Sequence, residues 1–510
     1  MDKTAERFLK DYEYFEEKTN EFYEGVLPRN EYKGISGGFG SYAEKSGESG
    51  MLRIRIPGGQ LTKERFRFLM EMKDVYHIPM MKFTTCETIQ LHNLQAWEIC
   101  SIAAEALENG IICRGGGGDF PRNVMVSPLT GVDPDETFDV MPYAKAMSDY
   151  LLSFIGKVTL PRKLKVCFSN NKDNVVHATY RDLGFVANSD RTFDVYIAGG
   201  LGLKPKLGVC VAENICPEEV LYYAKAMVDL FVEYGNYKVR SQARTRFMQD
   251  TLGREGLKEK YLEKLQEAKA GEDLKICPEE TIIRKTGKGE IVHKRAIPQK
   301  QEGLYAVSYH PIGGVPDLKV MQNLYDAIKE MEEAEVRLST DETAYIINLT
   351  AEEAGKVLEI TKGGAETCFE HSVACIGAKV CQHGLRDSQD LLRKCVEAVR
   401  EANIPDGALP SVHISGCPSS CGTHQTAAIG FQGGAKKEDG EMVPAFTVYL
   451  NGCSLQGQET ISQSSGMMLK RNIPKFLTEL GKTVENSGKT YEEWVKEHSE
   501  DVKAIAEKYL

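Results

Sequence analysis

The sequence predicts an α+β fold that is duplicated within one chain, and two observations support this prediction. The first is a constant shift of 255 residues between matching stretches, which is the separation of Gly58-Gly59 from Gly313-Gly314. The second is that each copy reads as a strand, a Gly-Gly turn, a helix and a returning strand. Repeated modules of this kind bury their sheets against helices and against each other. The further matches at this shift pair Thr85, Glu87-Thr88 and Asn93-Leu94 with Thr340, Glu342-Thr343 and Asn348-Leu349.

The element pattern is clearest in the first copy. LRIRIP alternates as a strand does, and residues 61–76 carry apolar Phe66, Leu69 and Met70 at helical spacing. KFTTCETIQLHNL then returns as strand. Farther along, Pro217-Glu218-Glu219 predicts the first turn of a helix over residues 220–234, because proline and acidic residues suit a helix start.

Two later stretches extend the match between the copies. The shift of 255 places Leu160 to Cys167 on Ser415 to Gly422, and Phe193 to Gly199 resembles Phe446 to Gly452 at a shift of 253. The first stretch, LPRKLK, is cationic, whereas the second, SGCPSSC, can bind a soft metal. We therefore expect one copy to hold an anion and the other to hold a metal centre.

Four cysteines near the C-terminus form two tight pairs. Cys375 and Cys381 are spaced C-x5-C, and Cys417 and Cys421 are spaced C-x3-C within GCPSSCG. Two such pairs can supply four thiolates to a [4Fe-4S] cluster. The flanking Gly416 and Gly422 allow unusual backbone dihedral angles around a cofactor. Structural zinc, buried free thiols and disulfides remain alternatives from spacing alone.

Composition indicates a globular intracellular protein. The chain has 510 residues, 42% of them hydrophobic, and a net charge of −11. This charge opposes broad attraction to nucleic acid or to an anionic membrane. No long apolar stretch and no apolar signal-peptide core are present, so we expect cytoplasmic localisation with no membrane and no nucleic-acid partner.

One local run is basic despite the acidic total. It is interpreted either as a solvated hairpin around Thr286-Gly287-Lys288-Gly289 or as a docking surface for an acidic electron donor. Its cations are Arg284, Lys285, Lys288, Lys294, Arg295 and Lys300.

The ordered motifs resemble those of the siroheme-dependent sulfite and nitrite reductases. The resemblance covers residues from about 50 to 460 and combines the C-x5-C pair and GCPSSC with LPRK. The motifs are MLRIRIPGGQLT, FTTCETIQLH, GGGGDFPRNV, LPRKLKV, YRDLGFVA, FDVYIAGGLG, ACIGAKVC and SGCPSSCGTHQTAAIGFQG.

The resemblance implies a fold of ferredoxin-like half-domains paired about a pseudo-twofold, with two α/β cofactor-binding domains. The implied boundaries are an N-terminal arm at 1–48, half-domains at 49–115 and 303–355, a siroheme and substrate domain at 116–255, a connector at 256–302, and a cluster domain with C-terminal helices at 356–510.

The resemblance also implies two cofactors, siroheme and a [4Fe-4S] cluster. Cys375, Cys381, Cys417 and Cys421 would ligate the cluster, and Cys421 would be the thiolate shared with the siroheme iron. Arg122, Lys163 and Lys165 would form a cationic substrate pocket, with Cys86 beside it, because guanidinium and ammonium groups bind oxyanions. The residues expected to contact the cofactor are Thr85, Gln90, His92, Arg122, Asn123, Lys163 and Cys421.

Two departures from the family pattern affect the expected activity. Cys86 stands where an arginine is typical, and Ser419 stands where asparagine is usual. Lys165 favours six-electron reduction of sulfite to sulfide, while reduction of nitrite to ammonia is the alternative. A thiol cannot replace a guanidinium, so the sequence predicts tighter sulfite binding for Cys86→Arg.

No dinucleotide fingerprint occurs in a suitable context, so a partner protein, expected to be ferredoxin, must supply electrons. Three other interpretations stay open: an oxygenase of the corrin pathway, a non-catalytic cluster protein and a structural zinc module.

Overall fold

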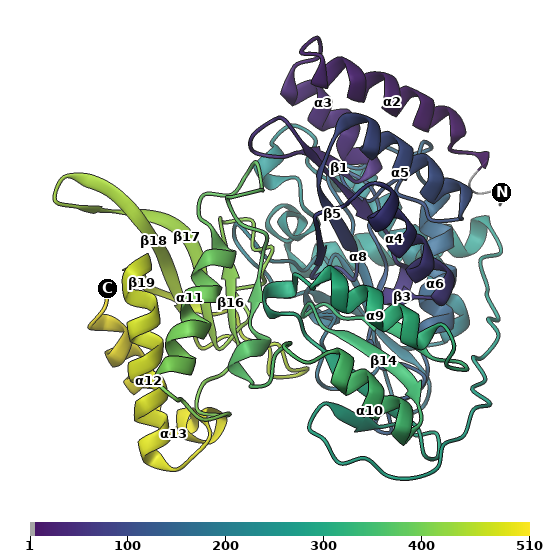
Figure 1. Cartoon of the computed structure of the whole chain (residues 1–510). Coiled ribbons are helices and arrows are strands. Elements are labelled where there is room, and N and C mark those ends of the chain that lie inside the picture. The colour runs from purple at the N-terminus through teal and green to yellow at the C-terminus, as the bar shows by residue number, and fades with distance from the viewer. Residues whose placement is uncertain (1–5) are drawn as a thin grey trace. The chain divides into compact units, whose positions relative to one another are not determined.

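The two sequence copies fold as two similar sheet-and-helix modules. The computed structural model describes residues 6–510 and separates into two units. The first runs up to Gly200 and includes Lys206–Tyr309 and Pro316–Lys362; the second comprises Leu201–Pro205, His310–Val315 and Gly363–Leu510. Residues 1–5 of the predicted N-terminal arm lie outside the described residues. Figure 1 shows the chain coloured from one end to the other.

The first half-domain is a four-stranded sheet in the order β1-β2-β5-β4, with all neighbours antiparallel. The predicted helix is α4 (Lys63–Val75), which begins at Thr62, whose side chain accepts a hydrogen bond from the Arg65 amide. The predicted returning strand is a hairpin whose turn, Thr84–Thr88, carries Cys86. The other elements are β1 (Ser41–Ala43), β2 (Gly50–Ile54), β4 (Met80–Phe83), β5 (Ile89–Leu94) and α5 (Ala96–Glu108).

The second half-domain repeats this order and takes in one strand from the first. Its sheet runs β11-β12-β14-β13-β3, and β3 (Gln60–Leu61) pairs antiparallel with β13 through Leu61 and Val336. The remaining elements are β11 (Ala296–Pro298), β12 (Tyr305–Tyr309), α9 (Leu318–Ile328), β13 (Glu335–Leu338), β14 (Ala344–Leu349) and α10 (Ala351–Ile360).

Backbone conformation confirms the duplication at the shift of 255. Asn93 and Asn348 share left-handed φ values of 59° and 61°, and Gly58 and Gly313 share values of 62° and 67°. A positive φ is uncommon for a residue other than glycine, so a match at equivalent asparagines is informative.

Equivalent acidic and basic residues lie close to each other where the half-domains meet. Lys82 of the first forms a fully buried ion pair of 2.6 Å with Glu342 of the second. At the equivalent positions, Arg337 of the second half-domain lies close enough to Glu87 of the first to act on its pKa. Positions 82 and 342 lie close together, and so do their equivalents 337 and 87. Such an exchange of equivalent positions is expected of a twofold relation. The duplicated, paired half-domains predicted from the sequence are confirmed.

The N-terminal helices α2 (Leu9–Tyr23) and α3 (Arg29–Ser36) cover the first half-domain (Figure 1). Phe15 stacks on Phe39 at a centroid distance of 4.4 Å, and the Tyr12 hydroxyl accepts a hydrogen bond of 3.1 Å from the Cys113 amide. Both Tyr12 and Phe15 are buried, so this segment is part of the hydrophobic core of the first unit.

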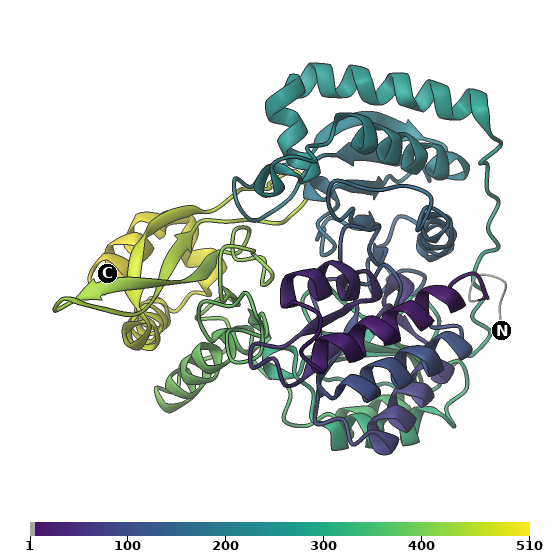
Figure 2. The ribbon, with the colours of Figure 1, turned by 90° about the horizontal axis from the view of Figure 1, so that it is seen from above.

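The α/β domain of the first unit holds a five-stranded sheet, β10-β9-β8-β7-β6, in which β6, β7 and β8 are parallel. Helices α7 and α8 pack together, and the Tyr261 hydroxyl of α8 donates to the Tyr223 carbonyl of α7 at 2.9 Å. Figure 2 shows the long α8 lying over this layer. The elements are β6 (Met125–Val126), α6 (Met141–Leu152), β7 (Val166–Ser169), β8 (Leu183–Ala187), β9 (Phe193–Ile197), β10 (Val209–Ile215), α7 (Val220–Tyr234) and α8 (Met248–Gly271).

The α/β domain of the second unit has the same topology. Its sheet runs β15-β16-β17-β18-β19, again with three parallel strands followed by two antiparallel ones. The elements are β15 (Val373–Ala374), α11 (Ser388–Glu401), β16 (Val412–Ser415), β17 (Ile429–Glu438), β18 (Glu441–Leu450), β19 (Gln463–Leu469), α12 (Ile473–Ser487) and α13 (Tyr491–Glu507).

The strand registers correct one sequence alignment. Strands β7 and β16, and β8 and β17, correspond at a shift of 246 residues, the separation of Val166 from Val412. The equivalent of the GCPSSC loop is therefore residues 170–175, and not LPRKLK, which precedes β7. The alignment at 255 was wrong because the segment between the half-domain and the α/β domain differs in length between the copies. The Phe193 and Phe446 match at 253 is confirmed, since these residues start β9 and lie in β18.

The basic run is extended and contains no hairpin. Residues 272–295 form no helix or strand, so the predicted hairpin around Gly287 is wrong. Three of its cations have internal partners: Lys285 pairs with Glu353 at 2.7 Å, Arg295 is buried and donates to Thr361 at 3.0 Å, and Lys300 pairs with Glu136. These contacts support a structural role for this segment.

Candidate functional site

Cys86 occupies a turn that is held from both sides. The Cys86 amide donates to the Thr84 hydroxyl at 3.3 Å, and the Cys86 carbonyl accepts from the Asn123 side chain at 3.1 Å. The same Asn123 nitrogen donates to the carbonyl of Ile56, two residues beyond β2, at 2.8 Å, so Asn123 joins both segments. Asn123 is buried and fixes where the half-buried Cys86 side chain lies.

Four cationic side chains act electrostatically on the Cys86 thiol. Burial by itself would raise the pKa of Cys86, but Lys165, Arg181 and Arg53 outweigh it and lower the pKa to about 6. Lys165 has the largest effect of these cations, and Arg122 also acts on this thiol. These surroundings therefore favour the thiolate form of Cys86.

Lys165 and Arg181 precede the parallel strands β7 and β8, so both lie at the amino-terminal end of this strand pair. The Lys165 amide donates to Asp182 at 2.9 Å, and the Arg181 side chain donates to the Val176 carbonyl at 2.9 Å. Asp182 is fully buried and also pairs with Arg244 at 2.9 Å. Burial lowers the pKa of the Lys165 ammonium, so losing this charge requires less alkali than usual.

Arg122 and Arg53 hold the glycine-rich loop that follows Cys113. Arg122 donates to the Gly116 and Gly118 carbonyls at 3.0 and 2.9 Å, and Arg53 donates to Gly116 at 2.7 Å. The Nε atom of Arg122 is buried and has no hydrogen-bond partner among residues 6–510. A buried donor without a partner is costly, so this guanidinium suits an added anionic ligand.

Two cations near these motifs are already neutralised. Lys82 is paired with Glu342, and Arg114 pairs with Asp11 at 2.8 Å while lying 4.6 Å from the centroid of Phe39. Neither compensates for the absence of a guanidinium at position 86. Arg53 and Arg181 were missed as candidates, although the alternation of LRIRIP could have indicated Arg53.

The predicted cofactor contacts differ in their exposure. His92 is buried, with its ring nitrogens 3.0 Å from Glu44 and 3.4 Å from Gln90. Burial lowers the pKa of His92, and these contacts support a structural role. Thr85 is also buried, whereas Gln90 and Lys163 are half-buried.

The four candidate cluster cysteines lie in neighbouring loops of the second unit. Burial raises the pKa of Cys375 and of Cys381, and the Cys421 thiol adds to both effects. The Cys375 sulfur accepts a hydrogen bond of 3.1 Å from the Gly416 amide. Cys375, Cys381 and Cys417 are partly buried, while Cys421 is exposed. Cluster sulfurs commonly accept such amide hydrogen bonds.

The cysteines as placed do not form a site for a single metal ion. Across residues 6–510, no three His, Cys, Asp or Glu side chains are close enough together to hold one. A four-iron cluster binds each thiolate to a different iron, so its ligands need not meet at one point.

The GCPSSC loop requires glycine for close packing. A Cβ atom at Gly422 would lie 2.3 Å from the Ile414 carbonyl oxygen, and one at Gly416 would lie 2.5 Å from the Arg386 carbonyl oxygen. Neither glycine has a positive φ, so the expected reason, unusual dihedral angles, is wrong. Ser420 instead adopts φ = 54° just before Cys421.

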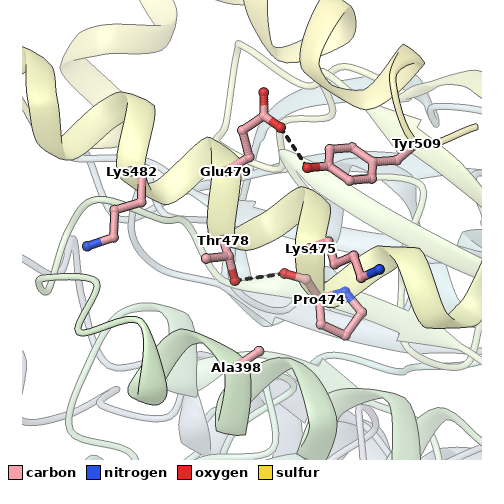
Figure 3. A pocket seen from close by; sticks show the side chains of 7 residues that line it. All are labelled: Ala398, Pro474, Lys475, Thr478, Glu479, Lys482 and Tyr509. Atoms are coloured by element: carbon pink, nitrogen blue, oxygen red, sulfur yellow. Dashed lines mark hydrogen bonds between the residues drawn. The ribbon is translucent and has the colours of Figure 1, made fainter.

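A separate open pocket of about 410 Å³ lies between α11, α12 and the C-terminus. Figure 3 shows Tyr509 donating to Glu479, a hydrogen bond of 2.6 Å. None of the candidate site residues lines it. The lining residues are Ala398, Pro474, Lys475, Thr478, Glu479, Lys482 and Tyr509.

Comparisons with known proteins find two family models that match the chain. Residues 42–109 match the nitrite/sulfite reductase ferredoxin-like half domain, and residues 117–269 match the nitrite and sulphite reductase 4Fe-4S domain. The second match covers the first α/β domain, which contains only Cys167, Cys210 and Cys216. It therefore reflects the fold that both α/β domains share, and the paired cysteines lie in the second copy.

The relatives include both kinds of reductase. An assimilatory ferredoxin-dependent nitrite reductase of Haloferax mediterranei is 24% identical, covering 92% of this chain and 85% of its own. A sulfite reductase [ferredoxin] 1 of Mycolicibacterium paratuberculosis is 25% identical, covering 87% and 81%. The structure of the Mycobacterium tuberculosis NirA protein aligns with a TM-score of 0.79 at 21% identity, covering 98% and 97%, and shows the same fold.

These matches indicate an iron–sulfur oxidoreductase. The chain is similar to the nitrite and sulfite reductases, through two family models over residues 42–109 and 117–269 and through relatives of both kinds at about 25% identity. Its residues fit both cofactors, since the cations around Arg122 suit the carboxylates of the macrocycle and the four thiols suit the cluster. No helix among residues 6–510 is long and apolar enough to cross a membrane.

Proposed function

We propose that this chain catalyses the six-electron reduction of sulfite or nitrite, with ferredoxin as the electron donor. The observation that carries this proposal is the group of four cations, Arg53, Arg122, Lys165 and Arg181, that act electrostatically on the half-buried Cys86 in the first unit. Such a group binds small oxyanions, because guanidinium forks and ammonium donors match their oxygen atoms.

The cysteine loops supply the second part of the proposal. Cys375, Cys381, Cys417 and Cys421 would hold the cluster, and Cys421 would be the thiolate that also serves the siroheme iron. Cys421 is the exposed member of the four, which supports its role as the sulfur that a second group can reach. When bound, the two cofactors supply electrons and an iron atom for the oxyanion.

The chain's own residues bind and orient the oxyanion and supply protons to its oxygen atoms. Arg122 and Lys165 hold substrate oxygens, and Lys165 is suited to deliver protons because burial lowers its pKa. Lys163 is half-buried in the same segment and adds positive charge. Oxygen atoms that leave as water need such donors.

The test is a reduction assay on anaerobically purified protein with reduced ferredoxin or a viologen. We expect sulfide from sulfite, ammonium from nitrite, or both, together with siroheme absorbance. Cluster absorbance without the siroheme band and without turnover would instead identify a non-catalytic cluster protein. Conversion of a tetrapyrrole without oxyanion reduction would identify a corrin-pathway oxygenase.

A further inference from the structure

His424 is a buried side chain beside the GCPSSC loop that the proposed function does not use. It is fully buried and follows closely after Cys421 in the chain. Its Nδ1 atom lies 2.9 Å from the Ser415 hydroxyl, and this hydroxyl accepts a hydrogen bond of 3.0 Å from the Gly422 amide. Because that amide belongs to the peptide bond after Cys421, the chain of contacts ends at the backbone of a predicted cluster ligand.

The hydrogen bonds determine how the imidazole ring is used. Burial lowers the pKa of His424 to about 3, so the ring is neutral at working pH. Among residues 6–510, the only acceptor that the Ser415 hydroxyl proton meets is Nδ1, so the hydroxyl donates to Nδ1 and the ring proton lies on Nε2. This Nε2 atom is buried and makes no hydrogen bond of normal geometry in the same part of the chain, although Gln432 lies near enough to act on the ring's pKa. A half-satisfied buried ring is costly, so the contact at Nδ1 needs an explanation.

The first copy shows that the backbone does not require this histidine. At the shift of 246 residues, Ala178 stands in the place of His424, and both are fully buried. Their carbonyl oxygens face equivalent glycines, since a Cβ atom at Gly184 or at Gly430 would collide with them. The same turn therefore forms around alanine, and the histidine belongs to the copy that carries the paired cysteines.

The serine hydroxyl also has different partners in the two copies. Ser169 is the equivalent of Ser415, and its hydroxyl donates to the Asn171 carbonyl at 3.1 Å. The Ser415 hydroxyl donates to the histidine instead, with its oxygen accepting from the Gly422 amide. The histidine therefore orients the hydroxyl, and the hydroxyl fixes the peptide plane that precedes Gly422.

We propose that His424 is a positioning residue that, through Ser415, holds Cys421 in the direction needed to serve both iron centres. The inference rests on the proposed function and deepens it, because it concerns the sulfur that the two cofactors would share. Residues behind a ligand orient it and tune the metal that it binds. Rotation of the adjoining peptide plane should therefore disturb electron transfer through the sulfur more than it disturbs retention of the cluster.

A substitution series on the holoenzyme tests this role. His424→Ala introduces the residue of the first copy, Ser415→Ala removes the other end of the contact, and His424→Asn keeps an acceptor atom in place of Nδ1. Both alanine variants should keep the wild-type sulfide content and oxyanion KM, while kcat falls by about 10- to 100-fold. The EPR spectrum of the reduced enzyme should change together with kcat, and His424→Asn should restore both.

Two further variants sharpen the test. The double variant with alanine at positions 415 and 424 should lose no more than either single variant, because both substitutions break one chain of contacts. Ser169→Ala removes the equivalent hydroxyl in the copy without paired cysteines and should leave kcat and the EPR spectrum unchanged. If His424→Ala does not fold, Ser415→Ala, which keeps the ring, carries the test.

The outcomes separate the two proposals. A wild-type chain that holds the cluster but reduces neither oxyanion overturns the proposed function, and the EPR spectra of the variants then decide the role of His424. A chain without a cluster overturns both. Alanine variants that unfold more readily yet keep the wild-type kcat and spectrum overturn the positioning role, since a purely structural histidine would give that result. Equal losses in Ser169→Ala, or no recovery in His424→Asn, overturn it as well.

Discussion

The loops after β7 and β16 occupy equivalent places in two copies of one sheet, yet they carry different chemistry. Both contain left-handed residues at matching positions, Asn174 and Ser420 with φ of 49° and 54°, and His177 and Thr423 with φ of 64° and 54°. Residues 170–175 contain no cysteine, whereas residues 416–421 contain two. The framework has been kept while the side chains that serve metal or anion binding have diverged, as expected where function depends on sites and not on folds.

The first copy places its chemistry elsewhere on the same framework. Its cations precede the strands, with Lys165 just before β7 and Arg181 just before β8. The position equivalent to Cys421 is Val175, whose carbonyl accepts a hydrogen bond from Thr340. One copy therefore uses this loop to contact the second half-domain, and the other uses it to present thiols.

The largest effect should follow from removing a thiol of the second copy. Cys421→Ser is expected to lose the cluster and lower turnover by about 100-fold or more, since a hydroxyl does not replace a bridging thiolate. Iron and acid-labile sulfide content report the loss. Cys368→Ser, at an exposed thiol in the same unit, should keep both, and equal losses in the two variants would argue against the assignment.

A cation of the first copy should matter for binding. Lys165→Met is expected to raise the KM or Kd for the oxyanion by about 10- to 100-fold, the range for losing a charged hydrogen bond. Steady-state kinetics and spectroscopic titration measure it. Lys172→Met changes an exposed lysine in the equivalent of the GCPSSC loop. If this control weakened binding as much, the cation site would lie elsewhere.

The reciprocal pairing between half-domains should be important for stability. Glu342→Gln leaves the Lys82 ammonium buried without its partner and is expected to cost about 3–5 kcal/mol of unfolding free energy. Chemical denaturation measures this cost. Glu352→Gln, which removes the exposed partner of Lys356, should cost at most about 1 kcal/mol. Similar costs for both would remove the case that the buried pair stabilises the paired modules.

The smallest effect concerns loop packing. Gly422→Ala brings a Cβ atom to 2.3 Å from a backbone oxygen and should cost about 1–3 kcal/mol, seen as a lower Tm and weaker cluster retention. In Gly434→Ala the nearest atom to the new Cβ is the flexible Met467 methyl group at 3.2 Å, so this change should cost less. The first copy has Val176 at the position equivalent to Gly422. If Gly422→Ala cost no stability, the two loops would differ less in their packing than the close contact at Gly422 indicates.

Much of the fold was predictable, because periodicity and repeated glycines report local backbone needs directly. The strand, Gly-Gly turn and helix order is confirmed, as is the helix over residues 220–234. The loop correspondence failed, because an ungapped shift cannot detect a difference in length before β7. The cation group around Cys86 was only partly predicted, since Arg53 in β2 and Arg181 before β8 are distant from Cys86 in sequence.

The central claim is that the second copy holds an iron–sulfur cluster on Cys375, Cys381, Cys417 and Cys421 while the first copy holds the anion. Iron, acid-labile sulfide and zinc content of the anaerobically purified chain tests it most directly. The account predicts about four sulfides and about five irons per chain, counting the siroheme iron. A colourless protein that contains zinc and no sulfide would contradict it.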